Sequence, residues 1–165
     1  MASAAGISEI IDTEALPRAV IDAKPPAWRR ILGAIVFPQR VVYVDLSQSE
    51  GRRRLTEAHE IGHRIIPWHE ESFLLDHEAS LMAQTRDKLE SEAYLAGSHL
   101  MFQAQHFMKT ALDFRVTLAT PILLSTQYRA SIHATLRYYV ENHPDDVAMI
   151  VTGRYQFSSG ALPVA

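Results

Sequence analysis

The sequence predicts an α+β domain in which two helices carry the functional side chains and a small β-sheet lies at one side. Two β-rich runs, 31–37 and 41–46, predict neighbouring strands. The residues that follow, up to Pro67, predict one helix of about five turns, and an apolar stripe at helical spacing predicts a longer one from about 85 to 112. With 165 residues, of which 47% are hydrophobic, the chain can bury a core of its own.

The expected domain covers residues 29–112. Residues 1–28 contain three prolines and only weak periodicity, so we expect an N-terminal arm. Residues 113–165 are expected to form a helix–strand extension, and their last segment lacks any periodic pattern, which is typical of a chain cut from a longer protein.

Within the extension, residues 114–124 predict extended structure, 125–142 a helix and 146–153 a strand, with a break at His143-Pro144. The strands at 31–37 and 41–46 predict a hairpin or two neighbouring strands. The first helix is expected to begin at a capping box, Ser47-Gln48-Ser49-Glu50. After Pro67 we expect a polar, acidic connection as far as residue 81.

Composition narrows the function classes. A formal net charge of −3 gives no basic field, so nucleic acid is not an expected partner. The chain has no cysteine, which excludes disulfides and thiolate metal sites. No secretory signal pattern and no apolar run of membrane-spanning length is present, so we expect a cytoplasmic protein with no membrane partner.

The segment Thr56-Glu57-Ala58-His59-Glu60-Ile61-Gly62-His63 contains the pattern His-Glu-x-x-His. On a helix, imidazoles four residues apart lie one turn apart on the same face and can bind one metal ion. Glu60, between them, can take a proton from a water at that ion. Because the predicted helix supplies the context that this chemistry requires, the sequence predicts a zinc hydrolase with His59 and His63 as ligands of Zn²⁺.

A catalytic zinc site has three protein ligands and one open position, so a third ligand is needed. His69 lies six residues after His63, which is the spacing of the last histidine in metzincins. That pattern has a glycine where this chain has Ile66, and a β-branched residue does not readily adopt the left-handed conformation needed there. His69 therefore remains an alternative third ligand.

The other candidates are Glu90 and Glu92, near the start of the longer helix, as in sites that combine two histidines with one glutamate. They stand two positions apart, so only one can point at the metal. Glu90 shares its face with apolar positions, where a buried carboxylate requires a partner such as a cation. Either glutamate could instead be a solvated first-turn residue that complements the helix dipole.

Two segments carry a resemblance to a known family. Residues 54–63, RLTEAHEIGH, resemble the "RFTLAHELGH" segment of ImmA/IrrE-type metallopeptidases, and residues 90–101, ESEAYLAGSHLM, resemble their "ExEANxFAAELLMP" segment. The strand and turn before the first segment are also similar, so the resemblance covers about residues 31–103. Ser131, Ala134 and Arg137 are weakly similar to a later "SxxAxxxR" helix of the family.

The resemblance implies a small zincin-like domain in which the helix with the histidine pair packs on the helix that carries the third ligand. That ligand maps onto Glu90. The family's asparagine is replaced by Tyr94, which we therefore consider as a donor to the transition-state oxyanion. The proline that ends the second segment is replaced by Gln103, so we expect the helix to continue.

The resemblance also implies a function, namely regulatory proteolysis in the cytoplasm by a zinc-dependent endopeptidase that cleaves a helix-turn-helix repressor. The alternative is a metal-bound binding module that sequesters a regulatory partner with little or no turnover. Glu60 argues against this alternative, because a purely structural metal site does not need a general base. The sequence makes no prediction of oligomeric state.

Overall fold

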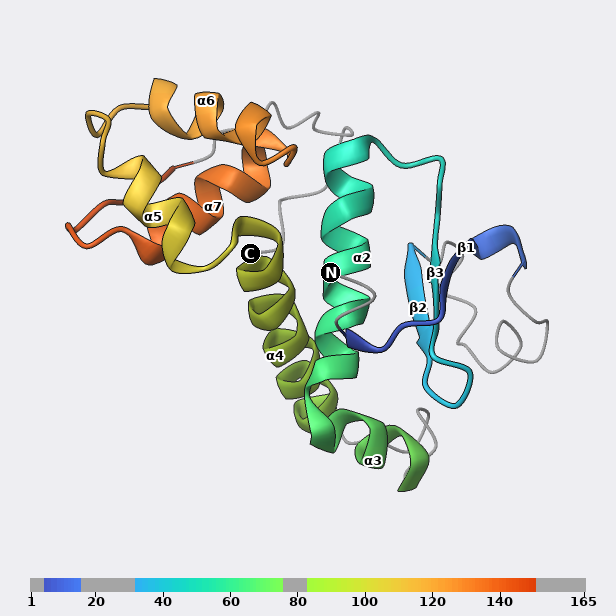
Figure 1. The fold of residues 1–165 in the computed structure, drawn as a ribbon. Helices are drawn as coiled ribbons and strands as arrows, with labels where there is room; N and C mark the ends of the chain where they lie inside the picture. The colour runs from blue at the N-terminus through green and yellow to red at the C-terminus, as the bar shows by residue number, and fades with distance from the viewer. Residues whose placement is uncertain (1–4, 16–31, 76–82, 151–165) are drawn as a thin grey trace, which may run out of the picture.

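The fold is that of a computed structural model, which describes residues 5–15, 32–75 and 83–150 (Figure 1). It confirms the predicted α+β class, with a three-stranded sheet on one side of a pair of long helices. In chain order the elements are β1 (Glu9–Asp12), the 3-10 helix η2 (Thr13–Ala15), β2 (Gly33–Val36), β3 (Val41–Val44), α2 (Glu50–Ile65), α3 (Pro67–Leu75), α4 (Ala83–Phe102), α5 (Gln105–Ala111), α6 (Ala119–Gln127) and α7 (Ile132–Asn142).

The sheet has the strand order β1-β3-β2. Strands β2 and β3 form the predicted antiparallel hairpin, in which Gly33 pairs with Val44 and Val36 with Val41. Strand β1 runs parallel to β3 and was not expected from the sequence. It is only four residues long and begins and ends with an acidic residue, so its pattern is too weak to predict a strand.

Helices α2 and α4 lie side by side and carry the site (Figure 1). Glycines allow their backbones to approach closely. A Cβ added at Gly62 of α2 would lie 2.4 Å from the Ala93 carbonyl oxygen, and one added at Gly97 of α4 would lie 2.6 Å from the Ala58 carbonyl oxygen. On its other side α2 packs against the sheet, where Ile61 joins a core cluster with Ile7, Val42 and Val44.

Helix α2 occupies the predicted region but begins differently from the prediction. Its N-cap residue is Ser49, and the expected capping box from Ser47 to Glu50 was wrong because the Ser47 hydroxyl donates to the carboxylate of Asp45. The helix ends before Pro67, as predicted. Up to residue 75 the connection expected after Pro67 is instead helix α3, which begins at Pro67, a position where a missing backbone N–H costs nothing. The rest of that expected connection, 76–81, lies outside the described residues.

The second long helix is shorter than predicted. It ends at Phe102, because Gln103 and Ala104 adopt positive φ angles of 58° and 45°, and α5 then begins in a new direction. The expectation that the helix continues through Gln103 was therefore wrong. Leu95 of this helix lies outside the buried stripe and is 56% exposed.

The C-terminal region is helical where an extended segment was expected at 114–124, since α6 occupies 119–127. The predicted helix at 125–142 is interrupted, and its second part is α7. The break at His143-Pro144 is confirmed. No strand forms over the described residues 146–150, and the rest of that predicted strand lies outside the described residues.

Helices α5–α7 pack against the C-terminal half of α4 around an aromatic core. The rings of Phe102 and Tyr138 stack with centroids 4.4 Å apart, and Phe107 contacts both. Arg54 of α2 donates to the backbone carbonyls of Tyr128 and Arg129, which ties this layer to the motif helix. These contacts place α7 beside the α2–α4 pair. Across the described parts of the chain, every helix is too short or too polar to cross a membrane.

Candidate metal centre

His59 and His63 of α2 and Glu90 of α4 converge at one point. Each offers a ligand atom, and these atoms all lie within 4.8 Å of one another. His59 Nε2 lies 3.0 Å from Glu90 Oε2, and His63 Nε2 lies 3.7 Å from Glu90 Oε1. The helix period brings the two histidines onto one face, and the close packing of α2 on α4 brings the carboxylate to them.

The charges of this cluster depend on one another. The hydrogen bond from His59 and the nearby imidazole of His63 hold the pKa of the Glu90 carboxyl far below its ordinary value, so it stays ionised. Burial lowers the pKa of His59, but the hydrogen bond to Glu90 and the charges of Glu60 and Glu90 outweigh it, so that pKa is raised. Burial dominates at His63 and lowers its pKa, so this imidazole is neutral near pH 7.

This donor set fits a divalent metal ion. Zinc binds imidazole nitrogens and carboxylate oxygens at about 2.0–2.2 Å, so tetrahedral ligand atoms lie about 3.3 Å apart. His59 Nε2 and His63 Nε2 lie 3.0 and 3.7 Å from the two carboxylate oxygens of Glu90, which is close to that spacing. Two imidazoles and one ionised carboxylate also match a catalytic site with an open fourth position, in which both imidazoles would bind the ion in their neutral form.

Glu60 lies on the side of α2 that faces the sheet, and its side chain is 8% exposed. A Cβ added at Gly33 would lie 2.8 Å from Glu60 Oε1, so the carboxylate rests against the backbone of β2. Glycine at position 33 therefore leaves room for Glu60 beside the strand.

The alternative ligand His69 lies behind His63, on α3. Its Nδ1 is 2.9 Å from His63 Nδ1, and its Nε2 is 3.1 Å from Glu92 Oε2. The second candidate glutamate, Glu92, therefore faces His69, whereas Glu90 faces the histidine pair. The indole N–H of Trp68 also donates to Glu92 Oε2, over 2.8 Å.

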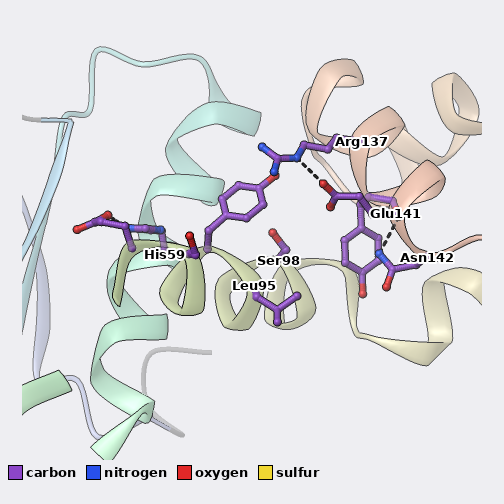
Figure 2. A pocket seen from close by; sticks show the side chains of 10 residues that line it. His59, Leu95, Ser98, Arg137, Glu141 and Asn142 are labelled. Carbon is purple, nitrogen blue, oxygen red and sulfur yellow. Dashed lines mark hydrogen bonds and ion pairs between the residues drawn. The ribbon is translucent and has the colours of Figure 1, made fainter. Parts of the chain in front are cut away.

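A pocket of about 610 Å³ opens beside the cluster, between α4 and α7. Figure 2 shows His59 at one end of it and Arg137, Glu141 and Asn142 of α7 across from α4. Tyr94, one turn after Glu90, lines the same pocket, and the Arg137 guanidinium lies 4.5 Å from its ring centroid. Tyr94 is thus adjacent to the cluster, and its role as an oxyanion donor stays a prediction.

A comparison with protein families decides the classification. The model of the Peptidase M78 family, described as an IrrE N-terminal-like domain, matches residues 20–138. The chain belongs to this metallopeptidase family. A comparison with curated proteins found no match.

The M78 match confirms the resemblance drawn from the two motif segments and extends past them to α7. The weakly similar residues in that helix have separate places in the structure. The Ser131 hydroxyl accepts from the Ala134 backbone N–H at the helix start, Ala134 is buried in the core, and Arg137 reaches the pocket.

Sequence reasoning on this M78 domain missed two sets of residues. The pocket residues Leu95, Ser98, Glu141 and Asn142 lie on helices whose packing the sequence does not specify. The contact of His69 with Glu92 could have been suspected, because both had already been singled out as possible ligands. What was missing was helix α3, which turns His69 back toward His63.

Proposed function

We propose that this protein is a zinc-dependent endopeptidase whose Zn²⁺ is bound by His59, His63 and Glu90. The observation that carries the proposal is the convergence of these three side chains from two helices, with the buried carboxylate of Glu60 next to His59 in a metallopeptidase family member. When bound, zinc supplies a Lewis acid for the scissile carbonyl and lowers the pKa of a water molecule.

Glu60 acts as the general base and acid. It accepts a proton from the attacking water and then donates a proton to the leaving amine. Its position supports this role, because β2 and α2 keep the carboxylate largely out of bulk water. The negative charge of Glu60 also contributes to the raised pKa of His59.

The peptide substrate lies in extended form between β2 and the pocket. Among the described residues β2 pairs with β3 alone, so its outer edge can accept a substrate segment as an added strand. That strand contains Gly33, which contacts Glu60, so a segment bound along it would pass close to the general base. The pocket beside His59 would receive a substrate side chain.

In this proposal the phenolic hydroxyl of Tyr94 donates a hydrogen bond to the developing oxyanion. It lines the pocket one helical turn from Glu90, and the Arg137 guanidinium against its ring favours a fixed ring position. Tyr94→Phe keeps the ring and removes the hydroxyl. We expect kcat to fall about 100-fold with little change in KM or zinc content. An unchanged kcat would exclude this role.

The biological substrate is a helix-turn-helix repressor in the cytoplasm, cut to switch on the genes that it controls. Support for this substrate comes from the family resemblance. The geometry is compatible with it, because a pocket and a strand edge beside the base suit an exposed, extended protein segment rather than a small metabolite.

The test is to incubate purified, zinc-loaded protein with a candidate repressor and to identify fragments by mass spectrometry. Glu60→Gln is the matched control, since it keeps the size of the side chain and all three ligands. We expect one cleavage site with the wild type and, for Glu60→Gln, normal zinc content with cleavage at least about 100-fold slower. A fully active Glu60→Gln protein would exclude the proposed mechanism, and stable binding without fragments would favour the binding module.

A further inference from the structure

We propose that His69 and Glu92 are positioning residues that fix the ring orientation and the tautomer of His63, so that its Nε2 presents a lone pair to the metal. This inference rests on the proposed metal site. It assigns to His69 a role behind the ligand rather than as a ligand. The chain of contacts joins three helices, with His63 on α2, His69 on α3 and Glu92 on α4.

The contact between His63 and His69 is buried. His69 has no exposed surface and His63 is 4% exposed, so solvent does not compete for the contact between them. The two Nδ1 atoms are 2.9 Å apart, which requires one hydrogen between them. Helix α3 also covers His63 with Phe73, whose ring lies edge-on with centroids 5.6 Å apart. The imidazole of His63 is therefore held on the side away from Glu90.

The directions of the two hydrogen bonds follow from the charge of Glu92, the last member of this series of contacts. Glu92 Oε2 accepts the indole N–H of Trp68, which can only donate, and a partly exposed glutamate is a carboxylate near pH 7, so Glu92 can only accept. His69 Nε2, 3.1 Å away, must then carry the hydrogen. A neutral His69 has only one, so its Nδ1 is an acceptor and the hydrogen between the rings belongs to His63 Nδ1.

The tautomer of His63 is thereby determined. With its hydrogen on Nδ1, a neutral His63 has a lone pair on Nε2, the atom that faces Glu90 and the metal position. The carboxylate of Glu92 makes His63 Nε2 more basic, because its charge acts through the hydrogen bonds that join both rings to it. Partners of this kind are worth about 10- to 100-fold in metal affinity.

Two substitutions at position 69 separate positioning from simple packing. His69→Gln keeps an oxygen that can accept the hydrogen of His63, whereas His69→Phe fills the space without an acceptor. By competition with a chelating dye, we expect His69→Phe to bind Zn²⁺ about 10- to 100-fold more weakly than the wild type and His69→Gln to recover most of that loss. Equal affinity of the wild type and His69→Phe would overturn the proposal.

Glu92→Gln leaves both rings in place and provides a test if the changes at position 69 prevent folding. Removing the charge should weaken zinc binding by roughly 10-fold, within the range for such partners. Glu71→Gln, at an exposed position of α3, is the matched control and should bind zinc normally. A Glu92→Gln protein with the same zinc affinity as this control would contradict the proposed role of Glu92.

A second measurement does not depend on zinc or on cleavage. In metal-free wild-type protein, ¹⁵N NMR of the histidine rings should show His63 with its hydrogen on Nδ1, and Glu92→Gln should shift this tautomer balance. A hydrogen on His63 Nε2 would overturn the inference. Because cleavage is not measured, failure of the peptidase proposal and failure of this inference give different results.

Discussion

The two histidines of the motif have contrasting surroundings. His63 is buried and lies between Glu90 and a chain of side chains from α3 and α4, whereas His59 is 22% exposed and lines the pocket. Its partner Glu90 is 48% exposed. The motif thus has one side that holds the cluster in place and one that is open to the pocket, and the two sides should respond differently to substitution.

The largest expected effect distinguishes the two sides directly. His63→Ala and His59→Ala should each abolish stoichiometric zinc binding, because each removes a ligand. His63→Ala should also lower the free energy of unfolding of metal-free protein by about 1–3 kcal/mol more than His59→Ala, because it leaves His69 Nδ1 buried without its partner. Urea denaturation in the presence of a chelator measures the difference. Equal losses of unfolding free energy in the two variants would contradict the proposed difference between His63 and His59.

The next effect concerns the helix contact on which both sides depend. Gly97→Ala places a methyl group against the backbone of Ala58 and His59 and should push α4 away from α2. We expect a loss of about 1–3 kcal/mol in unfolding free energy, together with weaker zinc binding. Gln84→Ala, at an exposed position of the same helix, is the control and should leave both quantities nearly unchanged. Normal zinc affinity in Gly97→Ala would show that the two helices need not approach so closely.

A smaller effect belongs to the open side alone. Arg137→Gln removes the cation that lies against Tyr94 across the pocket. We expect KM for a cleaved peptide to rise roughly two- to five-fold, the equivalent of one exposed cation–π contact, while zinc affinity stays the same. Arg52→Gln, at an exposed position on α2, serves as the control. A change in zinc affinity without a change in KM would contradict this assignment.

The smallest effect is a pH dependence of metal-free protein. The pKa of Glu90 is depressed in the folded protein, so ionised Glu90 stabilises the fold above pH 4.5, its ordinary pKa, and this stabilisation is lost as the pH falls below that value. The pKa of His59 is raised in the folded protein, so protonated His59 stabilises the fold below pH 6.5, and this stabilisation is lost as the pH rises through the folded-state pKa. The stability difference between the wild type and Glu90→Gln should therefore be largest between pH 4.5 and 6.5, by denaturation in a chelating buffer. A difference that is constant from pH 4 to 8 would contradict the ion pair.

The parts of the molecule that could be predicted from sequence depend on local patterns. The hairpin and the motif helix follow from β-rich runs and helix-ending signals, and the place of Glu90 follows from a resemblance in one short segment. The end of α4 could not be predicted, because positive φ angles at Gln103 and Ala104 are imposed by the packing of α5 rather than by a glycine or proline.

The site also combines features that follow from local sequence patterns with features that depend on tertiary packing. Spacing alone brings His59 and His63 together, but the contact of His63 with His69 depends on helix α3, where the sequence predicted only a polar connection. Apart from His59, the residues of the pocket come from α4 and α7, about 40 positions apart, and their meeting depends on the aromatic core between the two helices. Tertiary packing, rather than local propensity, determines these features.

X-ray absorption at the zinc edge on the loaded protein tests the central claim most directly, because it counts the imidazoles around the ion. The structure leads us to expect one zinc per chain with two imidazoles and a carboxylate oxygen, and the same spectrum for His69→Gln. Three imidazoles in the wild type, falling to two in His69→Gln, would show that His69 is a ligand and would contradict the assignment of Glu90.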